Sequence, residues 1–124
     1  MNIYVGHSRS FNYDKNLYQP LRESILDEEN TIVLPHEDSD KPFNSKEYLK
    51  KECDLFIAEV SNPSTGLGIE LGWADQNEVP IICVHVKDSD PSSSLTEVTD
   101  EINQYNSKKN LIEVIKKFVE EKEN

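Results

Sequence analysis

The fold is decided by residues 54–77, which read DLFIAEVSNPSTGLGIELGWADQN. The run from Leu55 to Val60 lacks a clean alternation of apolar and polar residues, as expected for a parallel strand that is covered on both faces. Ser61 to Thr65 are typical of a turn, and a helix is predicted from about Gly66 to Asn77. Because a second near-continuous apolar run follows at 81–86, the pattern predicts two parallel strands joined by a helix.

The same alternation of strands and helices extends over the rest of the chain. Further strands are predicted at 2–5 and 31–34, with a short edge strand at 104–107. The first helix is predicted from Asp14 onward, and Pro20 either starts or kinks it. A second helix is predicted from the N-cap Ser45 to Lys51. A weak helix or turn is predicted over 95–102, and a final helix around the amphipathic positions 111–119. With right-handed crossovers, this order predicts an α/β fold, a doubly wound three-layer α/β/α sandwich around a mostly parallel sheet of about five strands. We expect a single domain, 1–124.

Charge and composition exclude several classes of partner. The 124 residues carry a net charge of −11 at pH 7, whereas a DNA or RNA polymer or an anionic membrane requires a basic surface. No basic region typical of a signal peptide precedes the first strand, and no apolar run approaches the ~20 residues of a membrane span. Cys53 and Cys83 lack metal-ligand spacing and are interpreted as small buried hydrophobes. We therefore expect a cytoplasmic protein without a metal or cofactor.

Three loops are candidates for a small-molecule site, because ligands of doubly wound sheets bind outside the carboxyl ends of the strands. These loops are 6–13, 61–68 and 87–94. The middle loop combines Gly66 and Gly68 with the hydroxyl of Ser64 at the start of a helix, whose free N–H groups favour an anion. A tight turn with a capped helix explains the same residues equally well.

Two carboxylates near this loop are candidate catalytic groups. Glu70 lies in the first turns of the helix among apolar neighbours, where a carboxylate can act as a nucleophile or as an acid or base. An exposed helix glutamate is the alternative. Asp54 starts a buried strand although aspartate is a poor strand former; a cap or turn residue is the alternative there, at the strand end that normally lies away from the site.

The segment after the first strand is a second loop rich in hydrogen-bond donors. Its candidate binding residues are Gly6, Ser8, Arg9 and Ser10. Arg9 can bind a phosphate or carboxylate as a fork. Tyr4, in the strand itself, is more often a core residue than a catalytic one, and a lone loop histidine such as His7 is usually exposed to solvent.

The run from Asp54 to Ala74, together with 79–82 and the opening residues 3–6, resembles the core of the nucleoside 2-deoxyribosyltransferase superfamily. The resemblance covers most of residues 1–86 and fades afterwards. It implies a flavodoxin-like fold and cleavage of the N-glycosidic bond of a 2'-deoxynucleoside or its 5'-phosphate.

The resemblance also implies roles for single residues. Glu70 matches the carboxylate that attacks the anomeric carbon, and the covalent deoxyribosyl intermediate is then resolved by water or another base. Tyr4 matches a tyrosine that orients this nucleophile, and Asp54 matches an aspartate associated with catalysis or positioning. The family also implies a homodimer or a higher homo-oligomer, in which a neighbouring copy completes the site.

One position separates two branches of the family. Transferases acting on free nucleosides carry an acid six residues before the catalytic glutamate, and this chain has Ser64 there. A serine resembles the 5'-monophosphate N-hydrolase branch, where it contacts the phosphate; a hydroxyl donates to a phosphate that an acid would repel. Arg9 matches an arginine of that branch's first loop, but residues 7–12 replace the branch's Gly-rich sequence with HSRSFN.

Three functions remain open on this evidence. The first is hydrolysis or transfer at the N-glycosidic bond of a 2'-deoxynucleoside 5'-monophosphate. The second is a non-catalytic module that binds or senses a nucleotide on the same fold. The third is an N-glycosidase for another nucleotide, since a Gly-rich loop followed by a glutamate is compatible with each.

Overall fold

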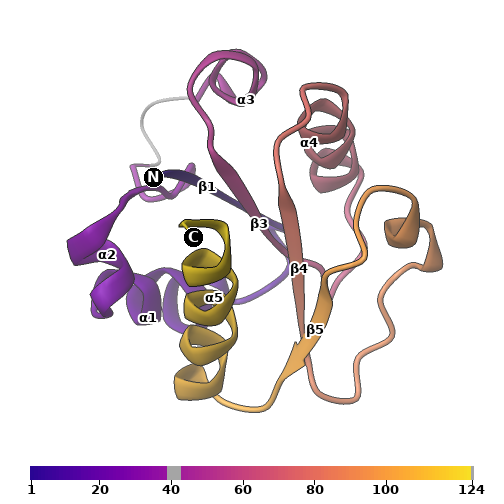
Figure 1. Cartoon of the computed structure of the whole chain (residues 1–124). Helices are drawn as coiled ribbons and strands as arrows, with labels where there is room; N and C mark the ends of the chain where they lie inside the picture. The colour runs from indigo at the N-terminus through magenta and orange to yellow at the C-terminus, as the bar shows by residue number, and fades with distance from the viewer. Residues whose placement is uncertain (39–42, 124) are drawn as a thin grey trace.

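The computed structural model describes residues 1–38 and 43–123 (Figure 1). Its five strands are β1 (Asn2–His7), β2 (Thr31–Val33), β3 (Leu55–Glu59), β4 (Ile81–Val86) and β5 (Ile102–Tyr105). All neighbouring pairs are parallel, in the order β2-β1-β3-β4-β5. The predicted doubly wound parallel sheet is thereby confirmed. The central strand β3 is fully buried, which explains its continuous apolar run.

Helical segments cover both faces of the sheet (Figure 1). One face carries a π-helical turn, η1 (Asp14–Tyr18), and the helices α1 (Gln19–Arg22), α2 (Ile25–Glu29) and α5 (Lys108–Glu123). The other carries α3 (Ser45–Lys51), α4 (Thr65–Gln76) and the 3₁₀ turn η2 (Ser93–Glu97). Each face has its own buried apolar cluster, so the molecule is the expected three-layer sandwich.

Several element boundaries differ from the sequence prediction. β1 continues to His7 instead of stopping at Val5. β5 begins two residues earlier than expected, and the segment predicted at 95–102 is the short 3₁₀ turn η2. Ser45 is the first residue of α3, whose N-cap is Asn44. The N-cap prediction for Ser45 is therefore wrong by one residue.

Pro20 falls at the start of α1, directly after the π-helical turn. Because proline has no N–H, it cannot donate to the carbonyl four residues earlier, and the first turn of a helix is where that loss is tolerated. The chain therefore contains two short helical segments here rather than one long helix.

The strand order places the topological switch point between β1 and β3. The connection after β1 leads to the face carrying α1, and the connection after β3 leads to α4 on the opposite face. The loops after these two strands therefore separate and leave a crevice at the carboxyl edge of the sheet.

Among the described residues, no helix is long and apolar enough to cross a membrane.

Candidate active site

Gly6 allows the two loops at the switch point to approach each other. A Cβ atom at this position would lie 2.7 Å from Phe56 Cζ and 2.9 Å from Leu67 Cδ1, so any side chain here would force Phe56 or Leu67 to move. Because Gly6 has no Cβ atom, the first turn of α4 packs directly against the end of β1. Asn62 Nδ2 then donates to Ser10 Oγ at 3.0 Å, and this bond links the loop after β3 to the loop after β1.

Glu70 lies in a cavity of about 610 Å³ between these loops. Its carboxylate accepts a hydrogen bond from the Tyr4 hydroxyl, across 66 residues of sequence. Burial raises the pKa of Glu70, while hydrogen bonds from Tyr4 and Ser45 oppose the rise. Burial and the neighbouring carboxylate also raise the pKa of Tyr4, so the phenol stays protonated and donates. The structure therefore holds one carboxylate, with a fixed direction, at a ligand-sized cavity.

Ser64 is the N-cap of α4, and its Oγ accepts the Leu67 N–H at 3.3 Å. Its own hydroxyl hydrogen is left to donate to a ligand. Gly66 lines the Glu70 cavity beside it, whereas Gly68 lines a second cavity on the other side of the helix start. Ser64 and Gly66 at the N-terminus of α4 therefore line the same cavity as Glu70, whereas Gly68 does not.

The loop after β1 brings three of the predicted binding residues to the same cavity, which is lined by Ser8, Arg9 and Ser10. Ser8 Oγ and Ser10 Oγ lie 2.8 Å apart and hydrogen-bond to each other. Arg9 is exposed at the rim. It is the residue in this loop whose guanidinium can bind an anion from the solvent side.

His7 is buried, not exposed as a loop histidine would be, because β1 extends through it. Its Nδ1–H donates to the Ser8 carbonyl at 3.0 Å, and Nε2 accepts the Tyr18 hydroxyl at 2.7 Å. Burial lowers the pKa of His7, which favours this neutral form. His36 contacts its ring edge to face and also lines the cavity.

Asp54 lies at the opposite edge of the sheet from Glu70. It precedes β3, and its Oδ2 accepts the Asn2 N–H at 2.7 Å, at the start of β1. The carboxyl ends of the parallel strands, where the cavity lies, are one strand length away. The structure therefore does not bring Asp54 to the other site residues, and its observed contact joins the start of β3 to the start of β1 instead of capping the preceding helix.

Two residues near the site were missed in the sequence. Ser45 reaches Glu70 from α3, and no spacing rule predicts which helix start lies above a distant cavity. Glu59 is completely buried at the end of β3, where it accepts from the Ser61 N–H at 2.7 Å and from the Tyr105 hydroxyl. A charged residue inside an otherwise apolar run was the available signal for Glu59.

No family model matches the chain. A search of curated proteins found relatives named "Putative 2'-deoxynucleoside 5'-phosphate N-hydrolase 1". The Methanosarcina mazei protein is 36% identical over 74 residues, which are 57% of this chain and 46% of that protein. The Syntrophotalea carbinolica protein is 41% identical over 46 residues, 36% of this chain and 32% of that protein. Over the matched segments, the expected resemblance to the 5'-monophosphate N-hydrolase branch is confirmed. The matched segments span less than half of either relative.

A search of solved structures found the CMP N-glycosidase BcmB of Clostridium botulinum. It is 21% identical, with a TM-score of 0.67 over 94% of this chain and 99% of that chain. At 21% identity the comparison is evidence of a shared fold, and it confirms the predicted α/β class.

Proposed function

We propose that this protein hydrolyses the N-glycosidic bond of a 2'-deoxynucleoside 5'-monophosphate, with Glu70 as the nucleophile. The observation that carries the proposal is the half-buried Glu70 carboxylate, oriented by the Tyr4 hydroxyl in a cavity that ends at the N-terminus of α4. The names of the sequence relatives support the same class of reaction.

The 5'-phosphate is proposed to lie at the start of α4. There the Ser64 hydroxyl and the Gly66 amide are donors, and the helix dipole favours a negative charge. Arg9, at the rim of the same cavity, contributes a positive charge. This arrangement explains how an acidic protein can bind an anion locally.

The reaction is proposed to proceed in two steps. A Glu70 carboxylate oxygen bonds to C1', while the C1'–N bond breaks and its electron pair leaves with the base, which gains a proton from solvent. Water then attacks C1', loses a proton, and releases the sugar phosphate as the Glu70 carboxylate is restored. The burial that raises the pKa of Glu70 also leaves its ionised form weakly solvated, and the ionised carboxylate is the reactive form.

The test is release of free base from deoxynucleoside and ribonucleoside 5'-monophosphates, measured by chromatography with wild type and Glu70→Gln. We expect release with wild type and a loss of at least ~1,000-fold in Glu70→Gln, because removing the nucleophile blocks the covalent step. Exposed Glu78→Gln, beyond the end of α4, is the matched control. A stabilising nucleotide that is bound but never cleaved would replace this proposal with the non-catalytic binding module.

A further inference from the structure

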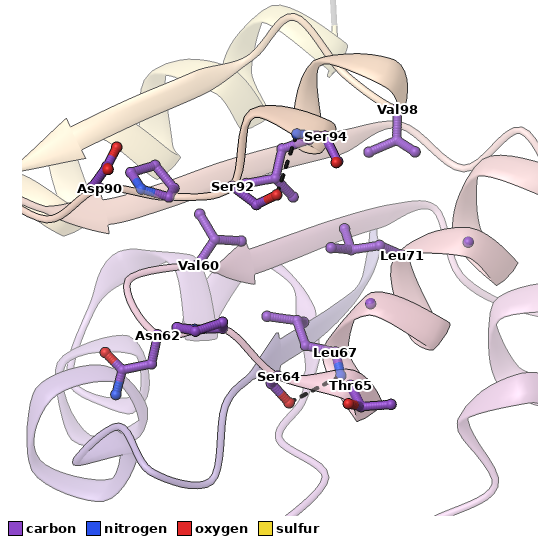
Figure 2. Close-up of a pocket in the computed structure, with 15 residues that line it drawn as sticks. Val60, Asn62, Ser64, Thr65, Leu67, Leu71, Asp90, Ser92, Ser94 and Val98 are labelled. Carbon is purple, nitrogen blue, oxygen red and sulfur yellow. Dashed lines mark hydrogen bonds between the residues drawn. The ribbon is translucent and has the colours of Figure 1, made fainter.

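A second cavity of about 580 Å³ lies on the other side of the α4 N-terminus and does not contain Glu70. Figure 2 shows Val60 at the end of β3 and Leu67 and Leu71 of α4 facing the segment after β4, which carries Ser92 and Val98. Its walls are mostly apolar, and its polar lining residues are Asn62, Ser64, Thr65, Asp90, Ser92 and Ser94. This volume is within the range of sites that hold a molecule of nucleoside size.

Two glycines of α4, Gly68 and Gly72, line this cavity. A Cβ atom at either position would meet nothing within 4 Å, and neither glycine has a positive φ. Glycine destabilises a helix interior relative to alanine, and here neither crowding nor backbone conformation requires it. The two glycines keep the helix surface flat where it borders the cavity, as is needed when another molecule packs closely against it.

The two cavities meet at the proposed phosphate position. Pro63, Ser64 and Leu67 line both of them. A phosphate held by the Ser64 hydroxyl therefore has the sugar and Glu70 on one side and the second cavity on the other. A group attached to that phosphate would extend into the second cavity.

The lining of the second cavity selects a neutral group. Among the described residues that line it, none is Lys or Arg, and Asp90 would repel a phosphate placed inside it, so both phosphates of a linked ligand have to lie at the N-terminus of α4, where the two cavities meet. A carboxylate does accept hydrogen bonds from the hydroxyls of a ribose, as in dinucleotide sites. The apolar wall formed by Val60, Leu71 and Val98 suits the flat face of a base.

We propose that the second cavity is a subsite for a neutral nucleoside joined to the substrate through its 5'-phosphate, so that the substrate class is a dinucleotide with a 5'-to-5' diphosphate link. The inference rests on the proposed function for the position of the phosphate, and it adds the group that lies beyond it. Gly68, Gly72 and Asp90 are the residues that distinguish such a ligand from a mononucleotide.

The test compares two ligands on the Glu70→Gln variant, which prevents turnover. Calorimetry measures the Kd of deoxycytidine 5'-monophosphate and of the same nucleotide joined through a diphosphate to adenosine, and the pair is repeated with the other three bases. We expect the dinucleotide to bind at least tenfold more tightly. Equal Kd values for the two ligands would overturn the proposal.

Gly72→Leu in the same background fills the second cavity without reaching the first, since Gly72 lines only the second. We expect it to remove the advantage of the dinucleotide and to change the Kd of the mononucleotide less than twofold. Asp75→Leu, exposed on the same helix and outside both cavities, is the matched control. Val98→Phe fills the cavity from the opposite wall and serves the same purpose if Gly72→Leu does not fold.

The outcomes separate this inference from the proposed function. If wild type releases no base but the dinucleotide still binds more tightly, and Gly72→Leu abolishes the difference, the reaction is wrong and the subsite stands. If a filled cavity weakens both ligands equally, the cavity is not a separate subsite and the inference fails. If neither ligand binds, both proposals fail.

Discussion

At the scale of single residues, the proposed reaction depends on the contact between Tyr4 and Glu70. The Tyr4 hydroxyl lowers the pKa of the Glu70 carboxyl, which burial raises. Tyr4→Phe should therefore move the acid limb of kcat/KM to higher pH, because the carboxyl must lose its proton before it attacks. We also expect kcat to fall by about 10- to 100-fold, the loss of one hydrogen bond to a charged group. A pH profile of base release measures both effects.

Tyr48→Phe is the control for this prediction. The centroid of the Tyr48 ring lies 6.0 Å from that of Tyr4. The variant therefore removes a hydroxyl from the same cluster of aromatic side chains and leaves the contact between Tyr4 and Glu70 in place. Its acid limb should match that of wild type. An acid limb that stays in place in Tyr4→Phe would show that the Tyr4 hydroxyl does not act on Glu70.

The residue scale also shows how far the sequence could predict the site. Glu70 and Ser64 follow from a strand–turn–helix pattern, because their placement is local. Ser45 depends on where α3 lies over the cavity, which is a long-range property that spacing does not contain. Asp54 illustrates the converse: its place at the start of a strand put it away from the expected site, but its contact with the N–H of Asn2 is long-range and was not predicted.

At the scale of elements, two glycines act on α4 in different ways. Gly6 allows the helix to pack closely against β1, and Gly72 lowers the stability of the helix itself. Gly6→Ala places a Cβ atom within 3.0 Å of Phe56 and Leu67 and should lower the free energy of unfolding by about 1–3 kcal/mol, the usual cost of overpacking. Gly72→Ala meets open space and should raise it by about 0.5–1 kcal/mol through helix propensity. Urea unfolding measures both. Two variants of equal stability would contradict the packing argument.

Elements were predictable where burial alone shapes the sequence. The apolar runs of β3 and β4 give their positions almost to the residue, because both faces of these strands are covered. The predicted position of the edge strand β5 was wrong by two residues, since a half-exposed strand needs fewer apolar side chains and gives a weaker pattern. At Pro20 the missing N–H predicted a break, but a π-helical turn is a less common solution than the two that were considered.

At the scale of the whole molecule, Glu59 ties the carboxyl ends of three strands together. It lies at the end of β3 and accepts from Tyr105 of β5, and it also accepts from the Ser61 hydroxyl, whose Oγ in turn accepts the Val86 N–H of β4 at 2.8 Å. The edge of the sheet that carries the site is thereby fixed by a buried carboxylate. Removing such an acceptor leaves buried donors without partners, which is costly.

The same carboxylate makes global stability depend on pH. Burial raises the pKa of Glu59 above its ordinary value of 4.5, so the folded protein keeps a proton that the unfolded chain loses. The free energy of unfolding should therefore fall as the pH rises from 4.5 through the raised pKa.

In Glu59→Gln this contribution is absent, and the fall in the free energy of unfolding should be smaller. In Tyr105→Phe, which removes a hydrogen bond that lowers the pKa of Glu59, the fall should extend to higher pH. Urea unfolding between pH 4.5 and about 8 tests the three proteins together, since the contributions of the ionisable groups that they share cancel in the comparison. Parallel curves would show that Glu59 keeps the same protonation in the folded and unfolded states, and its role would then be confined to its hydrogen bonds.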